Sequence, residues 1–168
     1  MTTLTRLLMV LSMTSALAAC GPDGGGGAAP TPDAGACSGV TPTAAAEQVI
    51  GNWKQTAGTV SCTCDNGQTI SSAADGTDQG TITAGCQPDQ VVLYDSSNPC
   101  PETCTVSGNT VTCDPFTCGS ATGTELQTTS DVYTLSNGQL FDVSAGVLSN
   151  ASMTCQCAST DSVYTRIQ

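Results

Sequence analysis

The pattern of apolar and polar residues divides the chain into three stretches. Residues 7–17 (LLMVLSMTSAL) form an apolar run. The run is too short to span a bilayer as a helix, which takes about 20 residues, but it has the length of a signal-peptide core. Residues 21–36 contain only Gly, Ala, Pro, Asp and Thr. Such a segment cannot bury enough apolar surface to offset its ordering entropy, so we expect a flexible linker.

The third stretch, residues 37–168, is predicted to be one all-β domain. After Gly51 it consists of short runs rich in Thr and Val, separated by turn signals, which is the pattern of antiparallel strands. The predicted strands are 52–64, 68–73, 79–84, 90–95, 103–107, 110–114, 122–129, 131–136, 139–144, 147–157 and 162–167. Before them, Thr41-Pro42 predicts a helix N-cap followed by Pro at the first helical position, and Gly51 predicts the helix end.

Three dipeptides predict tight hairpins. Asn66-Gly67 and Asn137-Gly138 are the strongest signals, because a type I′ turn needs two residues that tolerate positive φ, and Gly108-Asn109 is a weaker one. Consecutive hairpins predict an antiparallel meander, which forms either an up-and-down barrel or a sandwich.

The apolar run at the start of the chain ends in Leu17-Ala18-Ala19-Cys20. This sequence resembles the lipobox of bacterial lipoproteins, in which the cysteine is lipidated and becomes the mature N-terminus. The resemblance implies a signal peptide at residues 1–19, a lipidated Cys20 followed by a linker to residue 36, and export across the inner membrane. Gly21, in place of an Asp, favours anchoring in the outer membrane. The alternative is an ordinary signal peptide that is cut nearby, with Cys20 in a disulfide.

Composition indicates that disulfides support a small apolar core. Leu, Ile, Val and Phe make up 28 of 168 residues, whereas the chain has 11 cysteines. In small exported domains with many cysteines, disulfides usually supply the stability that a larger apolar core would otherwise give. The formal net charge of −11 excludes binding to a nucleic-acid backbone, and the absence of histidine from the sequence excludes Ser-His-Asp and Cys-His catalysis.

The register of the predicted hairpins suggests how ten of the cysteines pair. With Gly108-Asn109 as a two-residue loop, Cys104 faces Cys113, and Cys100 and Cys118 lie just outside the same hairpin. In the two Cys-x-Cys elements both sulfurs lie on one face of a strand, because side chains repeat every two residues. Antiparallel pairing of the first and last strands would join Cys62 to Cys157 and Cys64 to Cys155, which leaves Cys37 for Cys86. Cys20 remains for the lipid.

Other chemistry is more weakly indicated. The two Cys-x-Cys elements could instead build a four-thiolate metal site, although their spacing differs from that of structural zinc sites. Asp75 and Asp78 resemble a fragment of a calcium loop but complete no calcium motif, and such residues also form ordinary turns. No pair of carboxylates stands out as catalytic. We therefore expect no cofactor and no enzyme activity.

The segment Gly51-Asn52-Trp53, at the start of the first strand, resembles the Gly-x-Trp element of lipocalins and lipocalin-like bacterial lipoproteins. That resemblance implies an eight-stranded barrel with an apolar ligand cavity, and we expect Trp53 to fill the core. The sequence thus predicts a non-enzymatic envelope module held at the membrane by its N-terminal lipid, for structure or for contact with an envelope protein. The alternative is a lipocalin-like barrel that binds a small apolar ligand.

Overall fold

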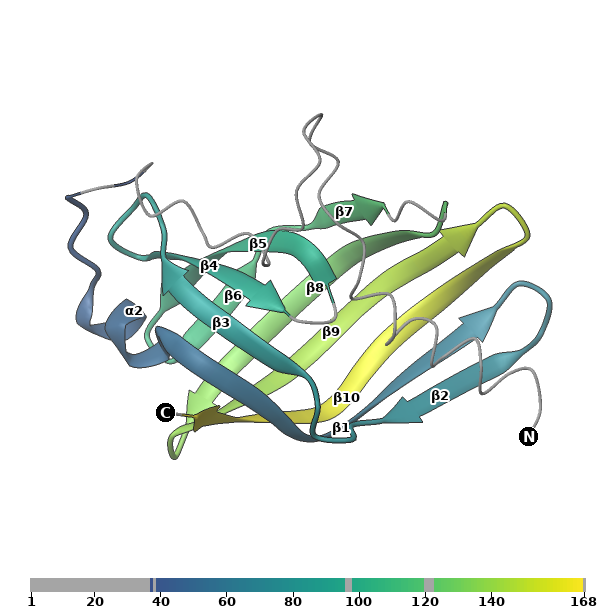
Figure 1. Ribbon diagram of the computed structural model, residues 1–168, viewed down its shortest axis with the longest axis horizontal. Helices are drawn as coiled ribbons and strands as arrows, with labels where there is room; N and C mark the ends of the chain where they lie inside the picture. The colour runs from purple at the N-terminus through teal and green to yellow at the C-terminus, as the bar shows by residue number, and fades with distance from the viewer. Residues whose placement is uncertain (1–36, 38, 96–97, 120–122, 168) are drawn as a thin grey trace, which may run out of the picture.

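The computed structural model describes residues 37, 39–95, 98–119 and 123–167 (Figure 1). The predicted signal peptide, Cys20 and the linker lie outside the described residues. The described chain forms an antiparallel β-barrel with one short helix and five disulfides, which confirms the predicted fold class and selects the barrel over the sandwich. No helix in these ranges is long and apolar enough to cross a membrane.

Eight strands close the barrel, in the order β10-β9-β8-β6-β5-β4-β3-β1 and back to β10. Two further strands flank it, because the long strands β1 and β8 each pair with two partners on one edge: β1 with β3 and then β2, β8 with β6 and then β7. The bounds are β1 Gly51–Cys64, β2 Thr69–Ala73, β3 Gln79–Ala84, β4 Gln90–Asp95, β5 Asn98–Ser107, β6 Thr110–Cys113, β7 Phe116–Gly119, β8 Glu125–Ser136, β9 Gln139–Asn150 and β10 Met153–Ile167.

Most predicted strands match, but the C-terminal third was divided wrongly. The predicted strands 122–129 and 131–136 form the single strand β8, which runs through a bulge between Thr128 and Ser130. The predicted strand 147–157 was wrong, because the chain turns between Asn150 and Met153 and begins β10 there. A bulge and a two-residue turn without glycine both lack the signals on which the prediction relied. Strand β7 was not predicted.

The turns follow their local chemistry. Asn137 and Gly138 both have positive φ (51° and 76°), as a type I′ turn between β8 and β9 requires. In the other two predicted hairpin turns only the glycines, Gly67 and Gly108, have positive φ.

The helix α2 (Ala44–Val49) lies at one end of the barrel and begins two residues later than predicted. Thr43, not Thr41, is the N-cap: its hydroxyl oxygen accepts a hydrogen bond from the Ala46 amide at 3.2 Å. The buried side chains of Ala46 and Val49 join the core, and the Val49 carbonyl accepts the Trp53 indole N–H at 2.8 Å. The helix therefore covers this end of the barrel.

Apolar side chains fill the α2 end of the interior. Trp53 is 2% exposed, so its predicted place in the core is confirmed. The guanidinium of Arg166 on β10 stacks over the Trp53 ring, 4.8 Å from its centroid, and donates a hydrogen bond to the Gln48 carbonyl. The other buried members of this cluster are Ala46, Val49, Ile82, Val91, Leu93, Cys104, Val106, Val111, Cys113, Tyr133 and Leu140.

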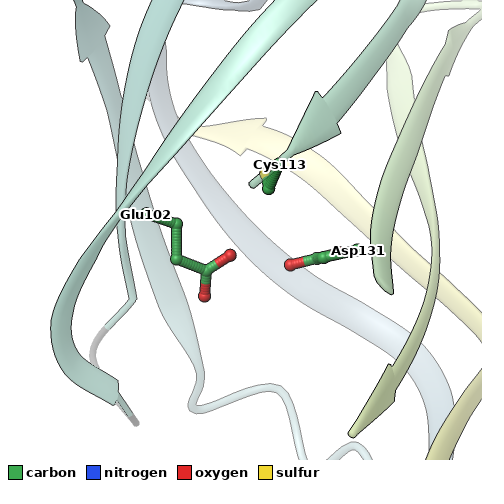
Figure 2. Close-up of side chains that lie close together, drawn as sticks. All are labelled: Glu102, Cys113 and Asp131. Atoms are coloured by element: carbon green, nitrogen blue, oxygen red, sulfur yellow. The ribbon is translucent and has the colours of Figure 1, made fainter. Parts of the chain in front are cut away.

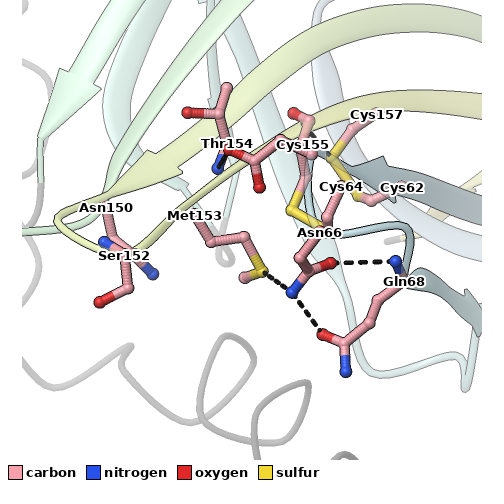
Figure 3. Close-up of a disulfide and its surroundings, with 11 residues drawn as sticks. Cys62, Cys64, Asn66, Gln68, Asn150, Ser152, Met153, Thr154, Cys155 and Cys157 are labelled. Atoms are coloured by element: carbon pink, nitrogen blue, oxygen red, sulfur yellow. Dashed lines mark hydrogen bonds between the residues drawn. A yellow bond between two sulfur atoms is a disulfide. The ribbon is translucent and has the colours of Figure 1, made fainter.

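Two bridges join β1 to β10 near the other end of the barrel (Figure 3). Cys62 is directly opposite Cys157, and Cys64 is directly opposite Cys155, with Cα–Cα separations of 4.0 and 3.8 Å. Both bridges connect residues more than 90 positions apart in sequence. They hold together the first and last strands, so they fasten the contact at which the barrel closes.

The two bridges should stabilise the protein non-additively. Either bridge alone closes the long loop and removes its entropy from the unfolded chain; the second bridge then closes only a loop of a few residues. We expect Cys62→Ala with Cys157→Ala to lower the free energy of unfolding by about 2 kcal/mol, and replacement of all four cysteines by Ala to lower it by about 6 kcal/mol. Guanidinium unfolding of the three proteins measures both values.

A first double variant that loses as much stability as the fourfold variant would contradict this account. Replacing Cys37 and Cys86 by Ala is the control for a bridge with no such duplicate, since its cysteines are 49 positions apart and no other bridge has both of its cysteines between them.

Candidate ligand cavity

A cavity of about 230 Å³ lies within the barrel. The apolar cluster around Trp53 borders it on the α2 side, where only a void of about 10 Å³ remains. On the other side it reaches Cys157 of the β1–β10 bridges. A second apolar cluster, formed by Cys64, Ile70 and Cys155, lies beyond that point. The interior is thus packed at the α2 end and hollow beyond it, where the cavity also borders Val60, which is 42% exposed.

A chain of polar side chains crosses the interior beside the cavity. The Gln55 amide donates to Ser162 Oγ (3.2 Å), Ser162 and Ser159 share a hydrogen bond (2.7 Å), and Ser159 donates to Asp142 Oδ2 (3.1 Å). Ser144 also donates to Asp142 Oδ2, at 3.5 Å. This polar belt, which runs from β1 through β10 to β9, holds one oxygen of Asp142 in place.

Local backbone irregularities place the belt. Strand β10 shifts register between Ala158 and Ser162, and β1 shifts on both sides of Ala57, the second time across Gly58. Ser159 and Ser162 are consequently both buried, although they are three positions apart and an odd spacing in a regular strand would place them on opposite faces. Gly58 packs on Ser162 so closely that an added Cβ would lie 2.7 Å from the Ser162 Cα, and its φ is +134°. Only glycine fits there.

Three carboxyl groups meet at the cavity wall. Glu102 comes from β5, Asp131 from β8 and Asp142 from β9, and their exposed fractions are 6%, 5% and 5%. Glu102 and Asp131 point toward one another (Figure 2). The Tyr133 hydroxyl donates to Asp131 Oδ2 at 3.1 Å. Among the described residues, no hydrogen-bond partner reaches Asp131 Oδ1 or Asp142 Oδ1 apart from the carboxyl groups themselves.

Burial raises the pKa of Asp131 and of Asp142 to about 8, from an ordinary value of 3.8. The second cause for Asp131 is the Glu102 carboxyl, and the second cause for Asp142 is Asp131 itself. Buried carboxyl groups this close together cannot all ionise, so Asp131 and Asp142 hold protons at neutral pH.

Further acidic groups line the same cavity. Asp78 and Asp95 are among its walls, together with Tyr133 and Tyr164. Burial, followed by the charge of Asp95, raises the pKa of Asp78. Burial raises the pKa of both tyrosines, helped by Asp131 at Tyr133 and by Asp95 at Tyr164. Lys54 and Arg166 are the bases of the described chain, and neither lines the cavity.

The carboxyl cluster was not predicted from the sequence, although a signal for it exists. On β9 the acidic Asp142 is buried, whereas its neighbours Phe141 and Val143 are 39% and 65% exposed. The usual alternation is therefore reversed, with polar side chains inside and apolar side chains outside. A strand reading LFDVS alternates equally well in both directions, so only the register of the barrel decides which face is buried.

The predicted disulfide cysteines all come together. The structure joins Cys37 to Cys86, Cys62 to Cys157, Cys64 to Cys155, Cys100 to Cys118 and Cys104 to Cys113, the same five pairs that the sequence analysis named. The alternative four-thiolate metal site is therefore replaced by two disulfides.

The two weak calcium candidates differ in position. Asp75 is exposed and forms a local turn, in which its Oδ1 accepts from the Thr77 amide at 2.9 Å and from the Thr77 hydroxyl. These bonds, the hydroxyl first, lower the pKa of Asp75. Asp78 instead lines the cavity. The structure thus gives Asp75 the ordinary turn role and Asp78 a place among the cavity carboxyls.

A different group has ligand atoms close enough to hold a metal ion: Glu102, Cys113 and Asp131, within 4.8 Å of one another. The Cys113 sulfur is bonded to Cys104, however, and a disulfide sulfur is not a thiolate ligand. The two carboxylates that remain, with Asp142 beside them, form an oxygen-only donor set. Such a set suits a hard cation or an ammonium group.

Comparison with known proteins gives no family. No protein-family model matches the chain, and no curated protein matches it. The eight-stranded barrel is compatible with the lipocalin-like architecture that Gly51-Asn52-Trp53 implied.

The raised pKa values predict that the barrel without ligand loses stability as pH rises. The folded state keeps protons on Asp131 and Asp142 that the unfolded chain releases near pH 4, so the contribution is fully present below that pH and is lost as pH rises through about 8. Asp142→Asn mimics the protonated form at every pH. At pH 8 we expect the free energy of unfolding of this variant to exceed that of the original protein by about 2 kcal/mol. The difference should shrink toward pH 4.

Urea unfolding at pH 4, 6 and 8 measures this difference. Asp114→Asn makes the same change in charge at an exposed position and should follow the original protein at all three pH values. Equal pH dependence of Asp142→Asn and the original protein would show that Asp142 is ionised in the folded state.

Proposed function

We propose that the protein is a non-enzymatic module of the bacterial cell envelope, anchored by a lipid on Cys20, whose barrel binds a small ligand in its interior. The observation that carries this proposal is the cavity of about 230 Å³ inside a barrel whose α2 end is filled by side chains. A hollow of this kind, with convergent polar groups on its wall, is what a small-molecule site needs.

The cavity size limits what can bind. Pockets for drug-sized molecules measure about 300–1,000 Å³, so this cavity suits a somewhat smaller molecule. It has no room for a folded partner or a long polymer, which supports a small-molecule ligand over a macromolecular one for this site.

The lining argues against the purely apolar ligand that the lipocalin resemblance implied. Polar groups on the wall include the carboxyls of Glu102, Asp131 and Asp142, with the hydroxyls of Ser144 and Ser159 beside them. An apolar ligand would cover these groups without replacing their hydrogen bonds to water, which costs free energy. A ligand with polar groups avoids that cost.

The cysteine pairing supports the anchoring part of the proposal. The five disulfides use ten of the 11 cysteines, and the cysteine that remains is Cys20. The apolar run before it and the linker after it give the arrangement of a lipid-anchored domain.

Mass spectrometry of protein purified from bacterial envelopes tests both parts. The denatured protein should begin at Cys20 and carry the mass of a diacylglycerol group, which Cys20→Ser removes. Under native conditions the protein should retain a small molecule that denaturation releases. Ser144→Leu, which fills the cavity wall, should lose that molecule, whereas Ser130→Leu on the exposed face of β8 should keep it.

A mature chain that keeps residues 1–19 would refute the anchor. A native mass equal to that of the bare chain, and unchanged when small-molecule mixtures are added, would refute the binding role.

A further inference from the structure

The charges inside the cavity do not balance. Asp131 and Asp142 are each 95% buried, both face the cavity, and each has one oxygen for which no amide or hydroxyl donor is present among the described residues. No Lys or Arg of the described chain lines the cavity. A buried carboxylate is costly unless it is paired. In the protein alone, protons meet this requirement; a bound cation can meet it instead.

We infer that the ligand of this barrel carries an ammonium group, which Asp131 and Asp142 hold at the cavity wall. This inference rests on the proposed ligand-binding function and names the chemical class of the ligand. The ammonium group offers three N–H donors, and Asp131 Oδ1 and Asp142 Oδ1 are the acceptors that await donors. Such charge-assisted hydrogen bonds are roughly twice as strong as neutral ones.

The walls of the cavity favour an organic cation over a metal ion. A cavity of about 230 Å³ is far larger than one ion needs, and an engineered protein cavity of about 150 Å³ already holds benzene. Apolar groups also line the cavity, namely Val60, Leu126, Gly146 and the Cys157 side chain. The cavity thus offers a carboxyl wall for a charged head and an apolar wall for a short hydrocarbon body.

Every titratable group around the carboxyl pair is acidic or phenolic. Glu102 faces it from β5 and Asp95 from β4; Tyr133 on β8 and Tyr164 on β10 complete the wall, with Asp78 before β3. A bound ammonium group makes ionisation of Asp131 or Asp142 favourable, so the protein releases a proton to the solvent as the ligand enters. Binding should therefore strengthen between pH 6 and pH 8.

Calorimetric titration of the purified full chain in non-ionic detergent tests the inference with two probes of the same shape. Benzylamine and benzyl alcohol share a ring and differ in the group that meets the carboxyls. At pH 8 we expect benzylamine to bind at least tenfold more tightly than benzyl alcohol. Asp142→Asn and Asp131→Asn should each weaken the binding of benzylamine at least tenfold and change the affinity for benzyl alcohol less than twofold. Asp114→Asn, at an exposed position, should change neither.

The outcomes separate this inference from the function on which it rests. If benzyl alcohol binds as tightly as benzylamine, the ligand class is wrong while the binding role stands. If calcium chloride alone binds with a stoichiometry of one, Asp142→Asn abolishes that binding and benzylamine does not compete, the site is a metal site and the inference is overturned. If neither probe binds, the inference also fails, and retention of a native molecule then decides the binding role separately.

Discussion

The pairing of β1 with β10 is the contact on which the rest of the structure depends. It joins the first and last strands of a meander, and without it the sheet would have two open edges and no interior. Apolar burial alone supports it poorly, because the chain has few large apolar residues. Two bridges, Cys62–Cys157 and Cys64–Cys155, fasten this pairing, and each joins two cysteines that lie directly opposite one another. Because covalent bonds hold the barrel closed, its interior does not have to be a fully packed apolar core.

Only part of the barrel interior is apolar. The α2 end is packed around Trp53, but the middle holds a polar belt, three carboxyl groups and a hollow. Buried carboxyls without a neighbouring base reduce stability at neutral pH, and a small domain tolerates them more easily when disulfides destabilise its unfolded state. Sites that reduce stability in the empty protein are often sites where a bound ligand restores it.

Sequence reasoning recovered what local chemistry determines. Asn137-Gly138 specifies its turn, the spacing of Cys104 and Cys113 around Gly108-Asn109 specifies a hairpin register, and both appear in the structure. The carboxyl cluster could not be predicted in the same way. Asp131 and Asp142 become neighbours only through the pairing of β8 with β9, and Glu102 joins them from β5 through the curvature of the closed sheet. The bulges beside Gly58 and Ser162 likewise shift register without a sequence signal strong enough to place them.

In the empty barrel Asp131 and Asp142 are expected to hold protons at neutral pH, because no Lys or Arg of the described chain lines the cavity beside them. Carbon-13 NMR of the side-chain carboxyl carbons, followed from pH 3 to pH 10 in ligand-free protein, tests it directly. The account predicts that the pair titrates with an apparent pKa near 8, far above the ordinary value of 3.8, while Asp75 titrates below that value. Titration of both Asp131 and Asp142 near pH 4 would show that the interior stabilises their charges by itself, and the argument for a cationic ligand would fall.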